Sequence, residues 1–163
     1  MNHLTPDELC QLVDSHFSTL VLYARGWNPE EAEDLVQDAF LQLVKRSHWE
    51  GRPEQPIAWL FRVVRNRAID RFRRDRKRVE REESFAKDRL SRFETGRNAT
   101  FYGEEIASEL DAMPPEQREI VLARIWGGLT FDEIAELLAS SRTTVYRLYT
   151  EALATMKQRF SHD

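Results

Sequence analysis

Residues 57–78 carry apolar side chains at helical spacing, and cationic side chains fill most of the positions between them. On a projection of about 100° per residue with Arg62 at 0°, the apolar side chains cover roughly 160° to 340°. They are Ile57, Leu60, Phe61, Val64, Ala68, Ile69 and Phe72. The arc from roughly 0° to 140° is almost wholly cationic. This stretch predicts a long helix with one face on a core and the other available to an anion.

The charge of the chain is distributed unevenly along its length. Ten of the 24 Lys and Arg lie between positions 62 and 81, where only three acids oppose them, so this window carries +7 within a net charge of −4. Residues 1–61 carry −6 and residues 82–163 carry −5. Arginine-rich faces are often only solvated surface, but here the acids are too few to neutralise the cations. Binding a polyanion would relieve the repulsion and would depend strongly on salt.

The rest of the sequence also favours helices. Among 163 residues there are six Gly and six Pro, and the apolar share of 41% is enough for a packed core. Thr5 and Pro6 are typical of a helix start, and a first helix ends near Gly26. Asn28 is expected to cap a second helix, and residues 47–56, which contain a glycine and two prolines, are expected to form a loop.

The second half of the chain begins after a charged stretch that lacks clear periodicity. We expect residues 80–103 to be a linker, with one helical piece near 82–93. A short helix then precedes Pro114, and a longer one ends at Gly127 and Gly128. The predicted fold class is all-α, with two small helical domains at residues 1–79 and 104–163.

Residues 130–150 have the spacing of a helix-turn-helix. Thr130 and Glu133 occupy capping-box positions, and Ser140 or Ser141 would cap the following helix. Ile134, Ala135 and Leu138 face Val145 and Leu148 across a short turn. An ordinary helical hairpin has similar spacing, but the outward side chains of the second helix favour DNA binding. They are Arg142, Thr143, Tyr146, Arg147 and Thr150.

Two further groups of residues are candidate binding surfaces. The second predicted helix carries an acidic side, which by default is solvated surface and which would repel nucleic acid. If that side binds anything, the partner is basic. Trp49, Trp59 and Phe61 lie beside the cationic stretch, where unpaired bases stack on aromatic rings. Aromatic rings at such positions are usually buried in a core. Trp49 is the ring most expected to be exposed instead, because it lies in a predicted loop.

The sequence gives little support for catalysis. Its four histidines, His3, His16, His48 and His162, are scattered, no Gly-rich phosphate loop appears, and Cys10 lies among apolar neighbours. We therefore expect no enzyme activity, no metal and no cofactor. The acidic start has no apolar signal core and no run is long enough to span a bilayer, so we expect a cytoplasmic protein without membrane insertion.

Three stretches in this order resemble one family. They are AEDLVQDAFLQLVK, WLFRVVRNRAIDRFRR and LDAMPPEQREIVLARIWGGLTFDEIAELLASSRTTVYR. Together they resemble an extracytoplasmic-function (ECF) bacterial sigma factor of the sigma-70 family, with region 2 near residues 5–80 and region 4 near residues 104–160. The tryptophan-led pattern of the second stretch, with an Asn, an Asp and Arg following, is the most specific part.

The resemblance implies partners and roles. The partners would be bacterial core RNA polymerase, through its β′ and β subunits, promoter DNA and an anti-sigma factor. The polymerase-binding residues would be Asp34, Gln37, Asp38 and Leu41. The promoter −10 element would be melted and held by the loop at 49–55 and by the basic helix, through Trp49, Arg62, Asn66, Arg67, Arg73 and Arg74. The −35 element would be read by Arg142, Thr143, Thr144, Tyr146 and Arg147.

The recognition helix departs from the family pattern. Family members usually carry a Gly-Thr-Val-Lys-Ser-Arg-like run and another Arg just before the alanine that matches Ala152. This chain has Glu151 at that last position, where a carboxylate would repel DNA phosphates.

The residues alone also leave open a free-standing helix-turn-helix regulator that binds duplex DNA as a dimer. An RNA-binding accessory protein is a weaker alternative that rests on the arginine run.

Overall fold

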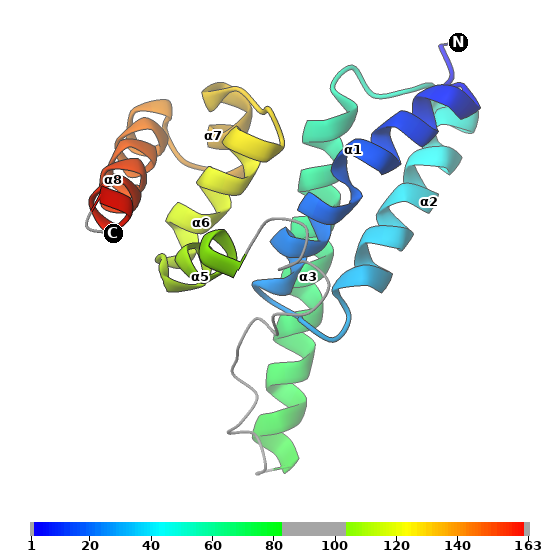
Figure 1. The fold of residues 1–163 in the computed structure, drawn as a ribbon. Helices are drawn as coiled ribbons and strands as arrows, with labels where there is room; N and C mark the ends of the chain where they lie inside the picture. Colours follow the sequence, from blue (N-terminus) through cyan, green and yellow to red (C-terminus); the bar gives the residue numbers. More distant parts are fainter. Residues whose placement is uncertain (1, 83–103, 162–163) are drawn as a thin grey trace. The chain divides into compact units, whose positions relative to one another are not determined.

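The computed structural model describes residues 2–82 and 104–161, and every regular element in these ranges is a helix, as the all-α prediction requires (Figure 1). The chain divides into two compact units, Met1–Glu94 and Thr95–Asp163. Of the linker predicted at residues 80–103, residues 80–82 belong to the end of a long helix, and residues 83–103, with most of the helical piece expected near 82–93, lie outside the described residues. Within those residues, no helix has both the length and the apolar character needed to cross a membrane.

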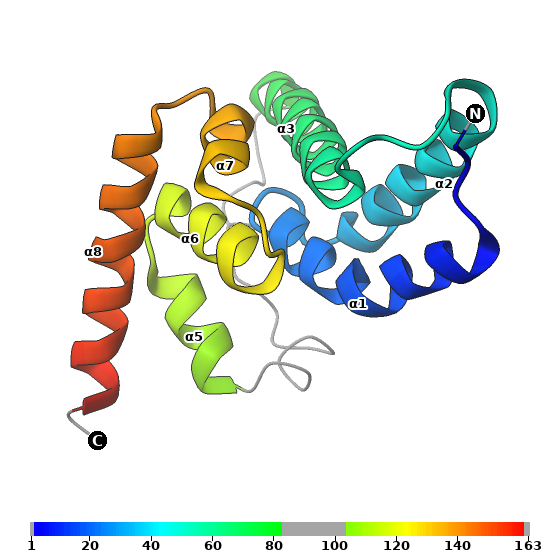
Figure 2. The same cartoon turned by 90° about the horizontal axis from the view of Figure 1, so that it is seen from above.

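The first unit is a bundle of three helices: α1 (Pro6–Arg25), α2 (Ala32–Glu50) and α3 (Pro56–Glu82) (Figure 2). Each helix contacts the other two. Their apolar faces form a core in which Leu20, Leu43, Leu60, Phe61 and Val64 are fully buried. Burying side chains of this size contributes about 1.5–3 kcal/mol each, so this core holds the three helices at fixed positions.

The start of α1 agrees with the sequence prediction, but the start of α2 does not. Thr5 and Glu8 form a complete capping box, with Pro6 in the first turn. Asn28, by contrast, does not cap α2, which begins four residues later at Ala32. Its buried side chain donates from Nδ2 to the carbonyl oxygen of Ala68 on α3, at 2.9 Å. Asn28 therefore ties the α1–α2 connection to the third helix.

The predicted loop at 47–56 is also shorter than expected. Residues 47–50 form the last turn of α2, and only residues 51–55 connect α2 to α3. Gly51 ends the helix with a φ of +88°, a conformation that favours glycine. Ser47, only 4% exposed, accepts hydrogen bonds from residues near the N-terminus, which keeps this turn packed. Trp49 thus lies on a helix rather than in a loop.

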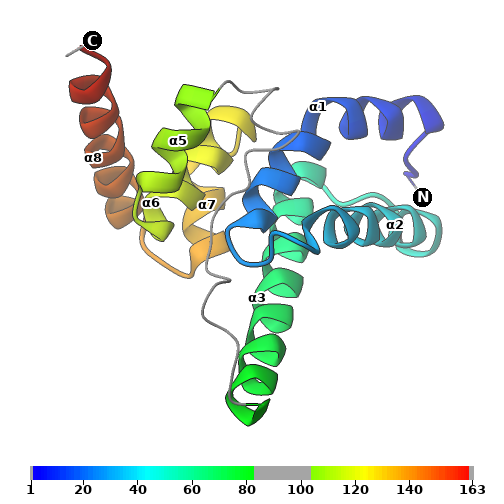
Figure 3. The same ribbon diagram turned by 60° about the horizontal axis from the view of Figure 1, so that its bottom comes forward.

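The C-terminal half of α3 extends past the ends of α1 and α2 (Figures 1 and 3). Leu60, Phe61, Val64 and Ala68 on its apolar face are buried as expected. Phe72, which the projection placed on the same face, is 41% exposed. The periodicity is correct, but the bundle ends before it reaches this turn. The helix also runs to Glu82, beyond the predicted domain end at residue 79.

The second unit contains α5 (Glu104–Ala112), α6 (Pro115–Val121), η2 (Leu122–Trp126), α7 (Phe131–Leu138) and α8 (Arg142–Ser161). Its core includes Leu110, Ile120, Leu122, Ile134 and Val145. The longer helix predicted before Gly127 is α-helical only to Val121 and then widens into a π-helical turn. There the N–H of Gly127 donates to the carbonyl oxygen of Leu122, five residues back, at 3.0 Å.

The helix-turn-helix prediction is confirmed in its local geometry. Thr130 and Glu133 form the capping box of α7, and Ser141, rather than Ser140, accepts the N–H of Thr144 at the start of α8. The turn holds Ala139 at a φ of +51°, in the left-handed region. Glycine usually occupies such a position, so this turn is made with a residue that the conformation disfavours.

Candidate nucleic-acid and protein interfaces

The acidic face of α2 projects into solvent. Asp34, Gln37 and Asp38 are exposed, and Leu41, one turn further on, is 58% exposed. Positions three, four and seven residues apart share one side of a helix, so these four side chains form one continuous surface. The apolar residues between them, such as Leu35, face the core. Leu41 therefore adds one large apolar side chain to a face that is otherwise polar and acidic.

The cationic face of α3 begins within the bundle and continues along its projecting half. Arg62, Asn66, Arg73 and Arg74 are exposed, and Arg67 is half-buried. None of Arg62, Arg73 and Arg74 forms an ion pair with another residue in 2–82 or 104–161. Their charge is therefore not neutralised by any described carboxylate, and it remains available to an anion.

Two ion pairs join α3 to the α2 region. Arg67 Nη1 lies 3.6 Å from Asp38 Oδ2, and Arg71 Nη1 lies 3.0 Å from Glu31 Oε1. Both pairs are partly exposed, so each contributes at most about 1 kcal/mol to stability. Arg67 was predicted to bind DNA and Asp38 to bind protein. The structure brings these two residues together at the boundary between the acidic and cationic faces.

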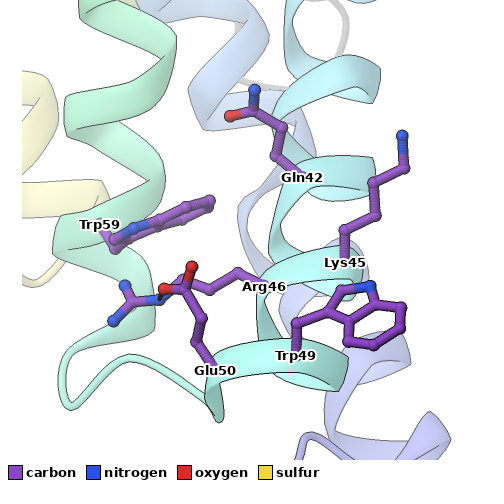
Figure 4. Close-up of a pocket in the computed structure, with 6 residues that line it drawn as sticks. All are labelled: Gln42, Lys45, Arg46, Trp49, Glu50 and Trp59. Carbon is purple, nitrogen blue, oxygen red and sulfur yellow. Dashed lines mark ion pairs between the residues drawn. The ribbon is translucent and has the colours of Figure 1, made fainter.

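An open pocket of about 440 Å³ lies between the end of α2 and the start of α3 (Figure 4). Its lining residues are Gln42, Lys45, Arg46, Trp49, Glu50 and Trp59. The guanidinium of Arg46 lies 5.7 Å from the centre of the Trp59 ring and 3.7 Å from Glu50. Trp49 is 73% exposed, with His48 packed edge-on against it. Cationic groups beside an exposed indole ring such as that of Trp49 are suited to stacking an unpaired base.

Three of these pocket residues, Gln42, Lys45 and Arg46, were not among the residues predicted from the sequence. Together with Trp49 they occupy positions i, i+3, i+4 and i+7, one face of a helix. That spacing could have revealed them, but the expected loop at 47–56 ended the predicted helix before Trp49. Of the other two aromatic candidates, Phe61 is fully buried in the core and Trp59 is half-buried at the pocket edge.

The second helix of the helix-turn-helix presents the side chains predicted to read DNA. Arg142, Thr143, Tyr146 and Arg147 are exposed, while Val145 is fully buried against the rest of the unit. Thr144 is half-buried, and its side chain accepts a hydrogen bond from Ser141 at 2.9 Å. Thr144 therefore serves the helix cap, and the remaining four side chains form the outward surface.

Carboxylates accompany the two arginines on this surface. Arg147 Nη1 lies 3.1 Å from Glu151 Oε1, and Arg142 Nε lies 3.8 Å from Asp132 Oδ1 at the start of α7. The ring of Tyr146 is held edge-on against Phe131, with centroids 5.4 Å apart, and stays 55% exposed. The outward surface of α8 is thus rigidly packed at its base but less cationic than its sequence suggests.

Comparison with known protein families gives two matches, in the same order as the two units. The model of "Sigma-70 region 2" matches residues 12–78, and the model of "Sigma-70, region 4" matches residues 103–156. The first match includes the acidic face of α2 and the cationic face of α3. The second includes the whole helix-turn-helix.

Two curated relatives resemble this chain over most of its length. The ECF RNA polymerase sigma factor SigK of Mycobacterium ulcerans is 24% identical over 131 residues, which cover 77% of this chain and 70% of that protein. The ECF RNA polymerase sigma factor EcfG of Rhodopseudomonas palustris is 30% identical over 120 residues, which cover 72% of this chain and 65% of that protein.

Among solved structures, the fold resembles that of the sigma factor RpoE of Bartonella quintana, solved in complex with the anti-sigma factor NepR. The TM-score is 0.67 at 17% identity, covering 98% of this chain and 99% of that one. At this identity the likeness supports the fold, and the family rests on the two regions and the curated relatives.

Proposed function

Because this chain belongs to the ECF group of the sigma-70 family, we propose that it binds bacterial core RNA polymerase and directs promoter recognition and transcription initiation. The observation that carries the proposal is the presence of both sigma regions, each with its own exposed charged surface. The protein would act by positioning polymerase and DNA, without a catalytic step of its own.

The acidic face of α2 is the proposed docking surface for polymerase, through the β′ subunit first and with β contributing elsewhere. Its carboxylates, Asp34 and Asp38, would pair with basic residues of polymerase. The exposed side chain of Leu41 would become buried on binding and supply an apolar contact. Apolar anchors near the centre of an interface usually contribute more binding energy than charges at the rim. The carboxylates would both orient and stabilise the complex, and Leu41 would add an apolar contact.

The cationic face of α3 and the pocket beside it form the proposed −10 site. Arg62, Arg73 and Arg74 would neutralise phosphates, and each such contact steepens the dependence of affinity on salt by about 0.9 in logarithmic slope. An unpaired base would stack against Trp49, a contact of about 1–3 kcal/mol per base. This stacking energy offsets part of the cost of opening the duplex.

The outward surface of α8 is the proposed −35 site. Arg142, Thr143, Tyr146 and Arg147 would face base edges and phosphates in the major groove, with the N-terminal half of the helix entering first. Since Glu151 already engages Arg147, this contact would be weaker than the number of arginines suggests. An anti-sigma factor is a further proposed partner, and the cytoplasm is the proposed location.

The proposal is tested by retention of bacterial core RNA polymerase on the purified, immobilised protein. Wild type is expected to retain polymerase, and the double variant Asp34→Arg, Asp38→Arg is expected to lose it. The matched control, Asp7→Arg with Asp14→Arg, makes the same charge change at exposed positions of α1 and should retain polymerase.

If the folded wild type, free of any inhibitor, does not retain polymerase, the sigma-factor proposal is overturned. Binding of duplex DNA by the protein alone, as a dimer, would then support the free-standing regulator, which the two-region match does not favour. If both double variants retain polymerase, the docking surface lies elsewhere on the protein.

A further inference from the structure

Residues 2–5, which we call the N-terminal strap, lie along the end of α2 and the loop at residues 51–55. The backbone N–H of Arg52 donates to the carbonyl oxygen of Asn2 at 2.7 Å. The N–H of Leu4 donates to Ser47 Oγ at 2.6 Å, and the ring of His3 donates from Nδ1 to the carbonyl oxygen of Ser47. Three successive residues of the strap therefore hold either the last turn of α2 or the loop after it.

An ion pair adds to these contacts. Arg52 Nη1 lies 2.7 Å from Oε1 of Glu8, whose other carboxylate oxygen accepts the N–H of Thr5 in the capping box of α1. The Thr5 N–H and, to a lesser degree, Arg52 lower the pKa of Glu8 below its usual value of 4.5. One carboxylate thus joins the end of the strap, the first turn of α1 and the loop.

The loop itself has little freedom where the strap crosses it. Gly51 adopts a φ of +88°, and a Cβ added there would lie 3.5 Å from the carbonyl oxygen of Asn2. Pro53, which has a fixed φ, is buried. A glycine in a conformation that other residues avoid, followed by a buried proline, gives the loop one backbone path while the strap is in place.

This loop connects the two walls of the pocket. Trp49 and Glu50 immediately precede it on α2, and Trp59 follows it in the first turn of α3. We propose that the N-terminal strap, with Glu8, positions the 51–55 loop and the adjoining pocket wall for capture of an unpaired base. This inference rests on the proposed −10 site, and it assigns a role to residues that lie outside that site.

The charge of Glu8 makes the inference distinguishable from an effect of the electrostatic field. A carboxylate near DNA repels phosphates, so replacing it with a neutral group should by field alone strengthen DNA binding. A positioning role predicts the opposite result, because without the Arg52 pair the loop samples conformations in which the pocket wall is displaced. The sign of the effect therefore decides between the two.

The first measurement uses the free protein and needs no DNA. Amide hydrogen exchange, followed by NMR on the whole chain, should show protected N–H groups at Leu4 and Arg52. Ser47→Ala removes the side-chain acceptor of the Leu4 N–H and should increase the exchange rate of Leu4. Because the strap is then held less firmly, the exchange rate of Arg52 should increase as well. If both amides of the wild type exchange at the rate of an unstructured peptide, the strap does not hold the loop and the inference is overturned.

The second measurement uses the holoenzyme on a promoter that the wild type opens. Glu8→Gln keeps an oxygen for the Thr5 N–H but removes the charge that Arg52 binds. We expect it to reduce promoter opening about two- to fivefold, the range for a partly exposed ion pair, with core polymerase affinity unchanged. Opening should also discriminate less between the native −10 sequence and single-base changes. Asp7→Asn, which removes the neighbouring exposed carboxylate, is the matched control and should behave as wild type.

The outcomes separate this inference from the function on which it rests. If the wild-type holoenzyme opens no promoter, the proposed function fails, and the exchange rates still test whether the strap holds the loop. If the wild type opens its promoter and Glu8→Gln matches Asp7→Asn in opening and in −10 discrimination, the positioning role is overturned. Loss of core polymerase affinity in Glu8→Gln would also overturn it, because the variant would then have disturbed the whole unit.

Discussion

Arg67 on α3 and Asp38 on α2 form an ion pair at 3.6 Å, so a residue of the proposed DNA site is bound to a residue of the proposed polymerase site. When polymerase binds the acidic face, a basic group of polymerase would approach the Asp38 carboxylate. That group would compete with Arg67 and weaken the Arg67–Asp38 ion pair. If the two proposed sites are correct, polymerase docking and DNA binding would be coupled through this one pair of side chains. The coupling would be at most about 1 kcal/mol, because both groups are partly exposed.

Replacing Asp38 should separate these two roles. Asp38→Asn is expected to weaken retention of core polymerase and also to raise low-salt affinity for a DNA oligonucleotide by up to about fivefold, because Arg67 is released. Asp34→Asn is the control, since Asp34 forms no ion pair with another described residue. It should weaken polymerase retention alone. Fluorescence anisotropy with labelled DNA measures the second effect, and equal DNA affinities for the two variants would argue against the coupling.

The projecting cations of α3 should determine the salt dependence of promoter binding. Arg73→Ala with Arg74→Ala is expected to lower the slope of log K against log salt by about 1.8, if each arginine contacts one phosphate. Arg71→Ala removes a cation that Glu31 already binds and should change the slope much less. Titrations of the holoenzyme between low and physiological salt give both slopes. If all variants have the slope of the wild type, the cationic face does not contact DNA phosphates and is ordinary solvated surface.

Glu151 should limit duplex binding by the second unit. Glu151→Gln frees Arg147 from its partner at 3.1 Å and is expected to strengthen binding to a −35 duplex severalfold at low salt. Glu151→Arg should strengthen it further. Glu136→Gln, an exposed neutralisation on α7, controls for the change in net charge. If the Glu151 variants bind no better than this control, Glu151 faces away from DNA.

Ala139 should be a site at which glycine stabilises the fold. Because its φ of +51° is disfavoured for alanine, Ala139→Gly is expected to raise the stability of the second unit by about 0.5–1 kcal/mol. Ala154→Gly, at an exposed position within α8, should lower it by about 1 kcal/mol. Amide exchange in α7 and α8 reports both changes. A destabilising Ala139→Gly would mean that the turn is not strained.

His16 should make the first unit less stable in mild acid. Burial lowers the pKa of His16 below 6.5, and its buried Nδ1 has no hydrogen-bond partner among the described residues. As the pH falls below 6.5, the unfolded chain takes up a proton that the folded chain does not, so the contribution present above that pH is lost. His16→Gln should therefore lose less stability than wild type between pH 7 and 5.5 in urea unfolding. Parallel losses would contradict this, and between pH 7 and 8 the two proteins should change alike.

The sequence predicted those features that depend on local periodicity and capping. The apolar positions of α3, the helix start at Thr5, the capping box at Thr130 and the spacing of the helix-turn-helix all follow from rules that act within one or two helical turns. The exposed positions of Asp34, Asp38 and Arg62 follow from the same periodicity. The assignment of these residues to polymerase and promoter came from the family resemblance.

The errors arose where distant parts of the chain meet. Asn28 is withdrawn from capping by a hydrogen bond to Ala68, forty residues away. The last turn of α2 persists to Glu50 because the N-terminal strap packs against Ser47, and no local rule anticipates that contact. Phe72 is exposed because the bundle ends, which its periodicity cannot show. The π-helical turn at Leu122–Trp126 likewise has no local sequence rule that predicts it.

The projecting half of α3 has a thermodynamic consequence for binding. It lacks the support of α1 and α2, so its helical order depends on local propensity and on charge. Repulsion among Arg73, Arg74, Lys77 and Arg78 would lower the free energy needed to unfold these turns locally. A polyanion that neutralises them would favour the helical form, so part of the binding energy would appear as helix formation. The enthalpy and heat capacity of DNA binding should then contain a folding contribution that α1 and α2 do not share.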